Sequence, residues 1–205
     1  MSPTEIALGV EDLPSELVLR RLVEPHRHLA VRQVRGLQGE GFLMANLPLW
    51  NRIARTFPTL VLLDLDRGCA PGKRQAALPD PHPNLLLRIA VYEVEAWLLA
   101  DHEAVNEWAG IPRARLPANV DTLTDPKREL VNLVRRHATA RLRRFIVPGD
   151  NDRRLTAPGY NDALRDLIQG QWNPDRAQTR SPSLARARER IARWRPRIEP
   201  WPQVR

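Results

Sequence analysis

The residues best suited to chemistry in this chain are carboxylates that follow apolar, strand-like runs. Asp64 and Asp66 come directly after the apolar run 59–63 and stand two residues apart. Side chains alternate between the two faces of an extended strand, so residues with this spacing project to the same side. Neighbouring carboxylates repel each other unless water, a proton or a metal ion intervenes, and Mg²⁺ prefers such oxygen ligands. The alternative is a polar strand end that is exposed to solvent.

The same pattern occurs at two other predicted strand ends. Glu11 and Asp12 follow the first apolar run of the chain, and Glu93 and Glu95 follow the fourth. In an open sheet of parallel strands, ligands bind beyond the carboxyl ends of the strands. We therefore expect these carboxylates to converge on one edge of a sheet and to bind Mg²⁺ or Mn²⁺, with solvated loop starts as the alternative.

Hydrophobic periodicity predicts the elements that position these carboxylates. The expected order is a strand over 5–10, a helix capped by Ser15 and stopped by Pro25, a strand over 29–34, a loop marked by Gly36, Gly39 and Gly41, a helix over 42–56, a strand over 59–63, a strand over 85–91 and a helix over 93–101. This alternation favours an α/β layer with a mostly parallel sheet flanked by helices.

The second half of the chain is predicted to be helical, with proline-rich connections. One helix is expected over residues 125–145, where an apolar stripe repeats at helical spacing. The pair Ser181-Pro182 predicts the start of a last, arginine-rich helix. We therefore expect an α/β core over residues 1–101, with a helical C-terminal region over residues 102–205 packed on it.

Composition limits the class of protein. With 205 residues, of which 42% are hydrophobic and 27% charged, the chain suits one core domain with a helical extension. Its single cysteine, Cys69, excludes an intrachain disulfide and a cysteine-based zinc cluster. Neither a membrane-spanning run nor a secretory signal is expected, so we predict a cytoplasmic protein. The net charge of +8 favours polyanionic partners such as nucleic acid.

Taken together, these motifs resemble a known fold. An acidic residue after the first strand, followed by Asp-x-Asp after the third, resembles the TOPRIM fold of topoisomerases, primases and overcoming-lysogenization-defect nucleases. The stretch from Glu93 to Asp101 resembles the Glu-x-Trp-Leu segment of TOPRIM-like proteins encoded in bacterial defence loci. Over its length the chain resembles a bacterial TOPRIM-like family, through the stretches 8–12, 64–66, 93–101, 125–127 and 181–184.

The resemblance implies a Rossmann-like TOPRIM core and Mg²⁺-dependent cleavage of phosphodiester bonds in DNA or RNA. Glu11, Asp64 and Asp66 match the metal-binding residues of TOPRIM proteins. Glu95 matches the additional glutamate of the nuclease-like branch, and Glu93 is a further candidate ligand. We therefore expect Glu11, Asp64, Asp66 and Glu95 to be catalytic. Topoisomerase and primase activities are not expected, because the chain is too short for their associated domains and lacks the cysteines of a zinc module.

Partners follow from charge and from the resemblance. The candidate nucleic-acid contacts are Arg67, Lys73, Arg74, Arg135 and Arg136. Solvated charges, or docking of the arginine faces over 135–144 and 186–197 to an acidic partner, are the alternatives. The resemblance implies an ABC/AAA-type ATPase partner and a role in anti-phage defence, and it leaves a homo-oligomer open. The competing hypothesis is a catalytically inactive TOPRIM-like module that docks on a partner ATPase or on nucleic acid.

Overall fold

The computed structural model describes residues 2–65 and 69–198 and divides the chain into two compact units. Unit 1 consists of Met1–Ile89 and Ala187–Arg205, and unit 2 consists of Ala90–Arg186. The division expected between residues 101 and 102 therefore falls inside unit 2.

The C-terminal segment belongs to unit 1 because long-range hydrogen bonds attach it there. Helix α10 (Pro182–Arg193) contains the point at which the two units divide. After it, Trp194 Nε1 donates to the carbonyl of Pro83 at 3.2 Å, and the backbone N–H of Arg197 donates to Asn84 Oδ1 at 2.9 Å. Contacts so distant in sequence leave no local periodic pattern, so the sequence did not reveal this return.

Unit 1 is built on a four-stranded parallel sheet with the strand order β2-β1-β3-β4. The strands are β1 (Thr4–Val10), β2 (Leu29–Gly36), β3 (Thr59–Asp64) and β4 (Leu85–Ala90). β1 pairs in parallel with β2 on one side and with β3 on the other, where Gly9 stands opposite Val61. The predicted α/β class is confirmed, and the strands that precede Glu11 and Asp64 are direct neighbours.

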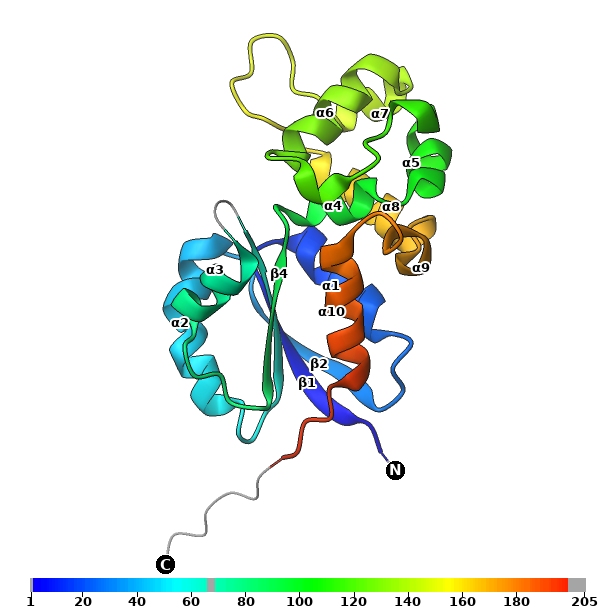
Figure 1. Cartoon of the computed structure of the whole chain (residues 1–205). Helices are drawn as coiled ribbons and strands as arrows, with labels where there is room; N and C mark the ends of the chain where they lie inside the picture. Colours follow the sequence, from blue (N-terminus) through cyan, green and yellow to red (C-terminus); the bar gives the residue numbers. More distant parts are fainter. Residues whose placement is uncertain (1, 66–68, 199–205) are drawn as a thin grey trace, which may run out of the picture. The chain divides into compact units, whose positions relative to one another are not determined.

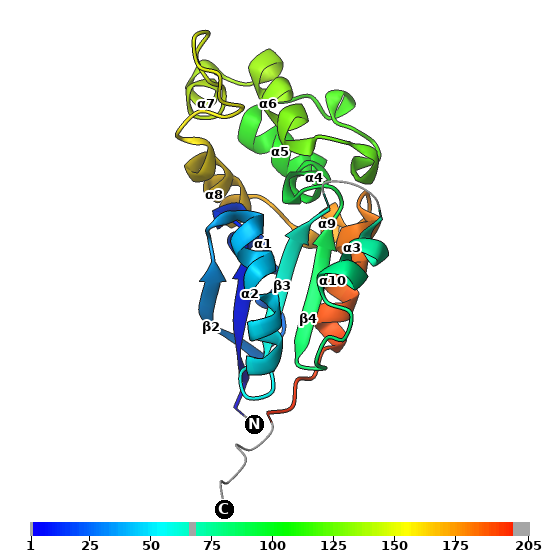
Figure 2. The ribbon, with the colours of Figure 1, turned by 90° about the vertical axis from the view of Figure 1, so that its left-hand side faces the viewer.

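Helices cover both faces of this sheet (Figure 1 and Figure 2). α1 (Leu13–Val23) and the C-terminal part of α10 lie on one face, whereas α2 (Gly39–Ile53) and α3 (Ala70–Ala77) lie on the other. The central strands are consequently buried on both faces, as is typical of parallel sheets. Every residue of β3 from Thr59 to Leu63 is buried, which explains why this strand is a continuous apolar run.

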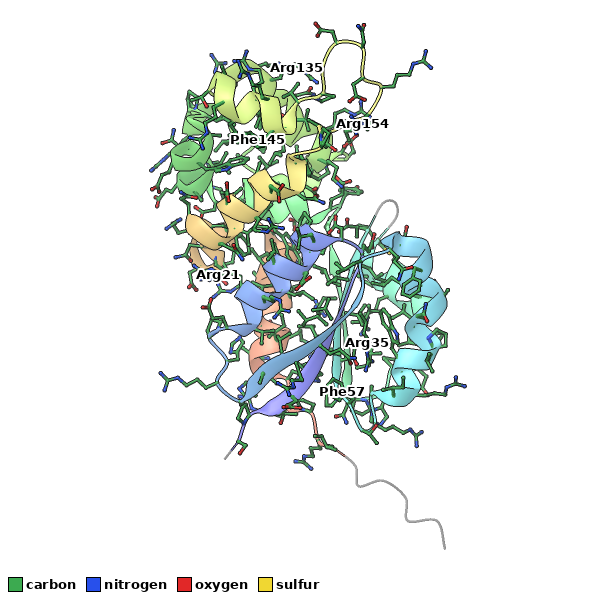
Figure 3. The ribbon with its side chains drawn as sticks, turned by 180° about the vertical axis from the view of Figure 1, so that it is seen from behind. Arg21, Arg35, Phe57, Arg135, Phe145 and Arg154 are labelled. Carbon is green, nitrogen blue, oxygen red and sulfur yellow. The ribbon has the colours of Figure 1, made fainter. Side chains whose placement is uncertain are left out.

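Two contacts fix the packing between the sheet and its surroundings. A Cβ at Gly9 would lie 2.7 Å from the ring of Trp50, so glycine lets α2 approach β1 closely. Arg35, which stands opposite Gly9 on β2, has its guanidinium 5.4 Å from the centre of the Phe57 ring (Figure 3). This cation–π contact stabilises a charged side chain against apolar surface.

Three local predictions were wrong, each for an identifiable reason. Asp12 rather than Ser15 caps α1, because the Asp12 side chain accepts the backbone N–H of Ser15 at 3.0 Å. Gly39 and Gly41, expected in a loop, lie in the first turn of α2. The single helix expected over 125–145 is broken into α6 (Pro126–His137) and α7 (Ala140–Ile146), because Thr139 caps a new helix. The apolar stripe continued through the break and hid it.

Apart from Ala90, the last residue of β4, the regular secondary structure of unit 2 is helical. Besides α6 and α7 it contains α4 (Val94–Leu99), α5 (His102–Ala109), η1 (Arg113–Arg115), η2 (Val120–Thr122), α8 (Tyr160–Gly170), α9 (Pro174–Ala177) and the first part of α10. Buried polar contacts join distant helices: Trp97 Nε1 donates to Ser183 Oγ at 2.7 Å, and Trp172 Nε1 donates to the Trp97 carbonyl at 3.0 Å. Ser181 caps α10 through the backbone N–H of Leu184, as predicted.

Within residues 2–65 and 69–198, every helix is too short or too polar to cross a bilayer.

Candidate functional site

Glu11 and Asp64 lie next to each other at the carboxyl edge of the sheet in unit 1, with the Glu11 carboxylate against the Asp64 backbone. Glu11 is the first residue after β1, and Asp64 is the last residue of β3. Glu11 Oε1 accepts the backbone N–H of Asp64 at 3.1 Å. The neighbouring parallel strands therefore deliver two of the predicted residues to one place. We call Glu11, Asp12, Glu40 and Asp64 the acidic edge.

The loop between β2 and α2 holds the backbone of Glu11 in place. The N–H of Leu37 donates to the Val10 carbonyl at 2.9 Å, and the N–H of Gly39 donates to the Glu11 carbonyl at 3.0 Å. Gly36 has φ +105°, and a Cβ there would lie 2.0 Å from the Val10 carbonyl oxygen. Only glycine fits this position, since both the dihedral angle and the close backbone contact exclude a side chain. The glycines that predicted a loop therefore serve to position Glu11.

Sequence reasoning missed Glu40. It lies in the first turn of α2, directly after the loop that contacts Glu11. Its carboxylate pairs with the ammonium of Lys73 at 2.7 Å, and Lys73 also donates to the Asp64 carbonyl. Lys73 is 14% exposed and is bonded to two residues of the acidic edge, so it is not the solvated loop charge that was its alternative. The signal was available, because Glu40 also follows a predicted strand at the same edge.

The electrostatic setting of Glu11 is unfavourable to negative charge. The pKa of the Glu11 carboxyl is raised to about 7, mainly by burial, with a further contribution from the nearby carboxylates of Glu40 and Asp12. The N–H of Asp64 and the ammonium of Lys73 oppose this rise in pKa without cancelling it. Near neutral pH, the acidic edge therefore stabilises either a proton or an added cation at Glu11.

The chemistry of the acidic edge fits a hard divalent cation. Carboxylate oxygens are its donors, and Mg²⁺ is usually held by one or two carboxylates, with water and phosphate completing its coordination. Asp66, the third predicted ligand, and Arg67 lie outside the described residues. Among residues 2–65 and 69–198, His, Cys, Asp and Glu form no group of three or more that could hold a metal ion. Glu11 and Asp64 are thus the pair available for the candidate site.

Glu93 and Glu95 belong to unit 2 and are bonded there. Glu93 precedes α4, and its Oε2 accepts the backbone N–H of Lys127 at 2.8 Å. Glu95 is fully buried; its Oε1 accepts a hydrogen bond from the Tyr160 hydroxyl at 2.9 Å and lies 3.3 Å from the ammonium of Lys127. In this structure both glutamates stabilise the packing of the helices in unit 2. A ligand role for Glu95 requires that a metal ion replace Lys127.

The remaining basic candidates lie at different places on their own units. Arg74 is exposed on α3 and lines a hollow with His82 and Arg190 in unit 1. Arg135 and Arg136 are exposed in the last turn of α6, in unit 2. Arg135 lines a hollow rich in arginine, and Arg136 does not.

No protein-family model, curated protein or solved structure matches this chain significantly. The resemblance to TOPRIM proteins therefore stays a prediction from the motifs.

Proposed function

We propose that this protein is a Mg²⁺-dependent nuclease of the TOPRIM type whose active site is the acidic edge of unit 1. The observation that carries the proposal is the direct contact between Glu11 and Asp64 at the carboxyl ends of neighbouring parallel strands. Ligands bind at this edge in open α/β sheets. The raised pKa of Glu11 supports a site that gains stability from a bound cation.

In the proposed mechanism, Glu11 and Asp64 would hold the ion, together with Asp66. A bound Mg²⁺ would supply positive charge that polarises the phosphoryl oxygens and lowers the pKa of water. Water attacks phosphorus and gives up one proton to solvent, the bond from phosphorus to the leaving oxygen breaks, and that oxygen takes up a proton from solvent. Lys73 holds Glu40 and the Asp64 backbone in position, since its ammonium bonds to both. The chain thus provides orientation and charge, and the ion provides the Lewis acid.

The substrate and partners in this proposal come from charge and from the resemblance. Nucleic acid is the substrate, in keeping with the net charge of +8. Arg67 and Arg74 are assigned to phosphates of the substrate, while Lys73 bonds to Glu40 and to the Asp64 carbonyl. An ABC/AAA-type ATPase is the assigned partner, and anti-phage defence in the cytoplasm is the assigned setting.

A second function is favoured by the internal ion pairs. Lys73 already provides a counter-charge for Glu40, and Lys127 provides one for Glu95. A module whose acidic residues are neutralised in this way can keep its fold without metal and act by binding alone. The second candidate is therefore a catalytically inactive module that docks on an ATPase or on nucleic acid.

Cleavage with and without divalent ions separates the two candidates. We expect the purified protein to cut labelled DNA or RNA in the presence of Mg²⁺ or Mn²⁺, and to be silent in EDTA. Asp64→Asn keeps the shape of the side chain but removes its charge, so we expect a loss of at least about 100-fold in cleavage rate.

A matched control is Glu5→Gln, because Glu5 lies on β1 outside the acidic edge and is exposed, with only a 3.7 Å ion pair to Arg32. It should cut at the wild-type rate. Equal, metal-independent cutting by wild type and Asp64→Asn would refute the nuclease assignment. Calorimetric titration of both proteins with Mn²⁺ adds a measurement that does not depend on the choice of nucleic acid.

A further inference from the structure

Unit 2 contains a hollow of about 720 Å³ that is lined by arginine side chains from three segments. Two come from α6, two from α7 and two from the loop that follows α7. They are Arg128, Arg135, Arg143, Arg144, Arg153 and Arg154. We call this hollow the arginine groove. Figure 3 shows Arg135 and Arg154, which represent its helical wall and its loop.

Local structure explains why these side chains converge. Arg128 and Arg135 are seven residues apart, so they lie on one face of α6 and about 10 Å apart along its axis. The loop after α7 is closed by the bond from the Ala157 N–H to the Ile146 carbonyl at 3.0 Å. Within it, Asp152 orients Arg154 through contacts of 2.6 Å and 3.0 Å. The groove is therefore a built feature that joins helix and loop.

The lining carries six arginines against two carboxylates, Asp150 and Asp152, so positive charge is in excess in the groove. Arg154 pairs with Asp152 at 2.6 Å, and Arg128 pairs with Asp125 at 2.7 Å. Arg135 instead donates to the neutral Asn132 at 2.6 Å, and Arg143 to the Ala138 carbonyl at 3.0 Å. As far as the described residues go, no ion pair is formed by Arg135, Arg143, Arg144 or Arg153. Gathered guanidiniums repel one another, so a polyanion bound here relieves a cost already present in the fold.

The chemistry of the lining indicates which polyanion fits. Guanidinium forks bind phosphate oxygens through paired hydrogen bonds. The lining contains no aromatic residue, so it offers no platform on which bases could stack. Its few apolar members, such as Val147 and Leu155, stand between charged ones and do not form the apolar core typical of a protein interface. These features favour contact with a chain of phosphates.

We propose that the arginine groove binds the sugar–phosphate backbone of nucleic acid, without preference for base sequence. The choice of polymer rests on the proposed nuclease function, whereas the phosphate-binding site itself rests on the groove. Arg128, Arg143, Arg144, Arg153 and Arg154 thus join Arg135 as binding residues, and Arg136 is excluded. Binding is dominated by released counterions, so it weakens steeply as salt concentration rises.

The test is equilibrium binding of the full-length protein in EDTA, which removes any cleavage. The probes are fluorescently labelled 20-nucleotide single-stranded DNA, single-stranded RNA and duplex DNA of mixed sequence, each titrated at several NaCl concentrations. The groove variant is Arg144→Gln with Arg153→Gln. The matched control is Arg136→Gln with Arg141→Gln, which removes the same charge from exposed positions of α6 and α7 that do not line the groove.

We expect the groove variant to bind at least about 10-fold more weakly. The slope of log affinity against log salt should fall by roughly 1.4 to 1.8, the value for two lost phosphate contacts. The control pair should change affinity less than about 3-fold. Equal losses for both pairs would overturn the inference, because they would indicate diffuse attraction by net charge. Thermal unfolding of each variant checks that the fold is kept.

Two further outcomes separate this inference from the nuclease proposal. Groove-dependent binding without any metal-dependent cleavage would refute the nuclease and leave the groove standing. Metal-dependent cleavage, together with wild-type affinity of the groove variant for nucleic acid, would refute the inference about the groove and leave the nuclease proposal standing. Polyglutamate serves as the competitor for the protein-partner alternative. If it displaces the nucleic acid as well as unlabelled nucleic acid of equal charge does, the groove is a site for acidic proteins and the inference fails.

Discussion

Glu11 in unit 1 and Glu95 in unit 2 are the same residue type in contrasting environments. Glu11 is half-buried, lies among other carboxylates and has its pKa raised to about 7. Glu95 is fully buried, but Tyr160 and Lys127 provide a hydrogen bond and a positive charge. Sequence pattern assigned both to one metal site. The comparison shows that burial alone does not describe the surroundings of a carboxylate, because the charges of the neighbouring groups differ between the two positions.

The largest expected effect tests the backbone contact that positions Glu11. Gly36→Ala should lower the free energy of unfolding by about 2–4 kcal/mol, because alanine meets both a positive φ and the Val10 carbonyl. Gly39→Ala is the matched control: its φ is +82°, but its Cβ would have open space, so we expect a loss of only about 1 kcal/mol. Chemical denaturation measures both, and equal losses would show that the Val10 contact is unimportant.

The next prediction tests the contrast between Glu11 and Glu95 directly. Glu95→Gln should lower the free energy of unfolding by about 1–3 kcal/mol, because it leaves Lys127 without its buried carboxylate partner. The estimate lies below that for a fully buried pair, since Lys127 is 27% exposed. Glu11→Gln at pH 8 should not lower stability, because it removes a charge that the site disfavours.

Glu103→Gln is the surface control for Glu95→Gln. Glu103 is 52% exposed and lies 3.6 Å from Arg113 and 3.4 Å from Arg176; pairs at such distances on the surface contribute little, so the change should stay within about 0.5 kcal/mol. If Glu95→Gln were equally mild, Glu95 would not be a structural residue of unit 2. A role for Glu95 in metal binding would then be favoured over a structural one.

The pH dependence of stability sharpens the comparison. The pKa of Glu11 is about 7 in the folded protein, above its value in an unfolded chain. Between the two values the native state holds the proton and the unfolded state does not, so the free energy of unfolding falls as pH rises toward 7. Glu11→Gln should remove this component of the slope, whereas Glu5→Gln should not. Denaturation curves between pH 4.5 and pH 8, recorded in EDTA, measure it.

The smallest expected effect concerns Lys73, the positive charge that lowers the pKa of Glu11. Lys73→Met removes an ammonium that lowers the pKa of Glu11, so that pKa should rise above about 7. Arg74→Met removes a neighbouring charge that does not act on Glu11 and should leave its pKa unchanged. Carbon-detected NMR titration of the glutamate carboxyl groups measures this. If the pKa of Glu11 were unchanged in Lys73→Met, the ammonium of Lys73 would not act on the charge of Glu11, and its ion pair with Glu40 would be its main electrostatic contact.

The alternation of apolar runs with helical stripes was enough to predict the sheet. β1 and β3 are continuous apolar segments because central parallel strands are buried on both faces, and the carboxylates after them follow from that topology. The contact between Glu11 and Asp64 confirms the convergence predicted for these two residues. Local pattern was informative here because the topology of a parallel sheet brings successive strand ends to one edge.

The features that could not be predicted depend on competition between neighbouring polar groups, which hydrophobic periodicity does not encode. Asp12 and Ser15 both had the chemistry of a cap, and the backbone geometry selected Asp12. Glu40 was hidden because its flanking glycines predicted a loop. The partners of Glu95 are distant in sequence, so nothing near position 95 indicated that its charge is used inside unit 2.

Cys69, the only cysteine of the chain, lies at the start of α3 and is exposed. The Cys69 carbonyl accepts the backbone N–H of Lys73 at 2.9 Å, so Cys69 is bonded to the first turn of α3, the helix that carries Lys73. Lys73 in turn pairs with Glu40 of the acidic edge. A spin label or fluorophore attached at Cys69 therefore reports from beside that edge in the unaltered sequence. Broadening of the label's signal by Mn²⁺ would place the ion without crystals, and no cysteine would have to be added or removed.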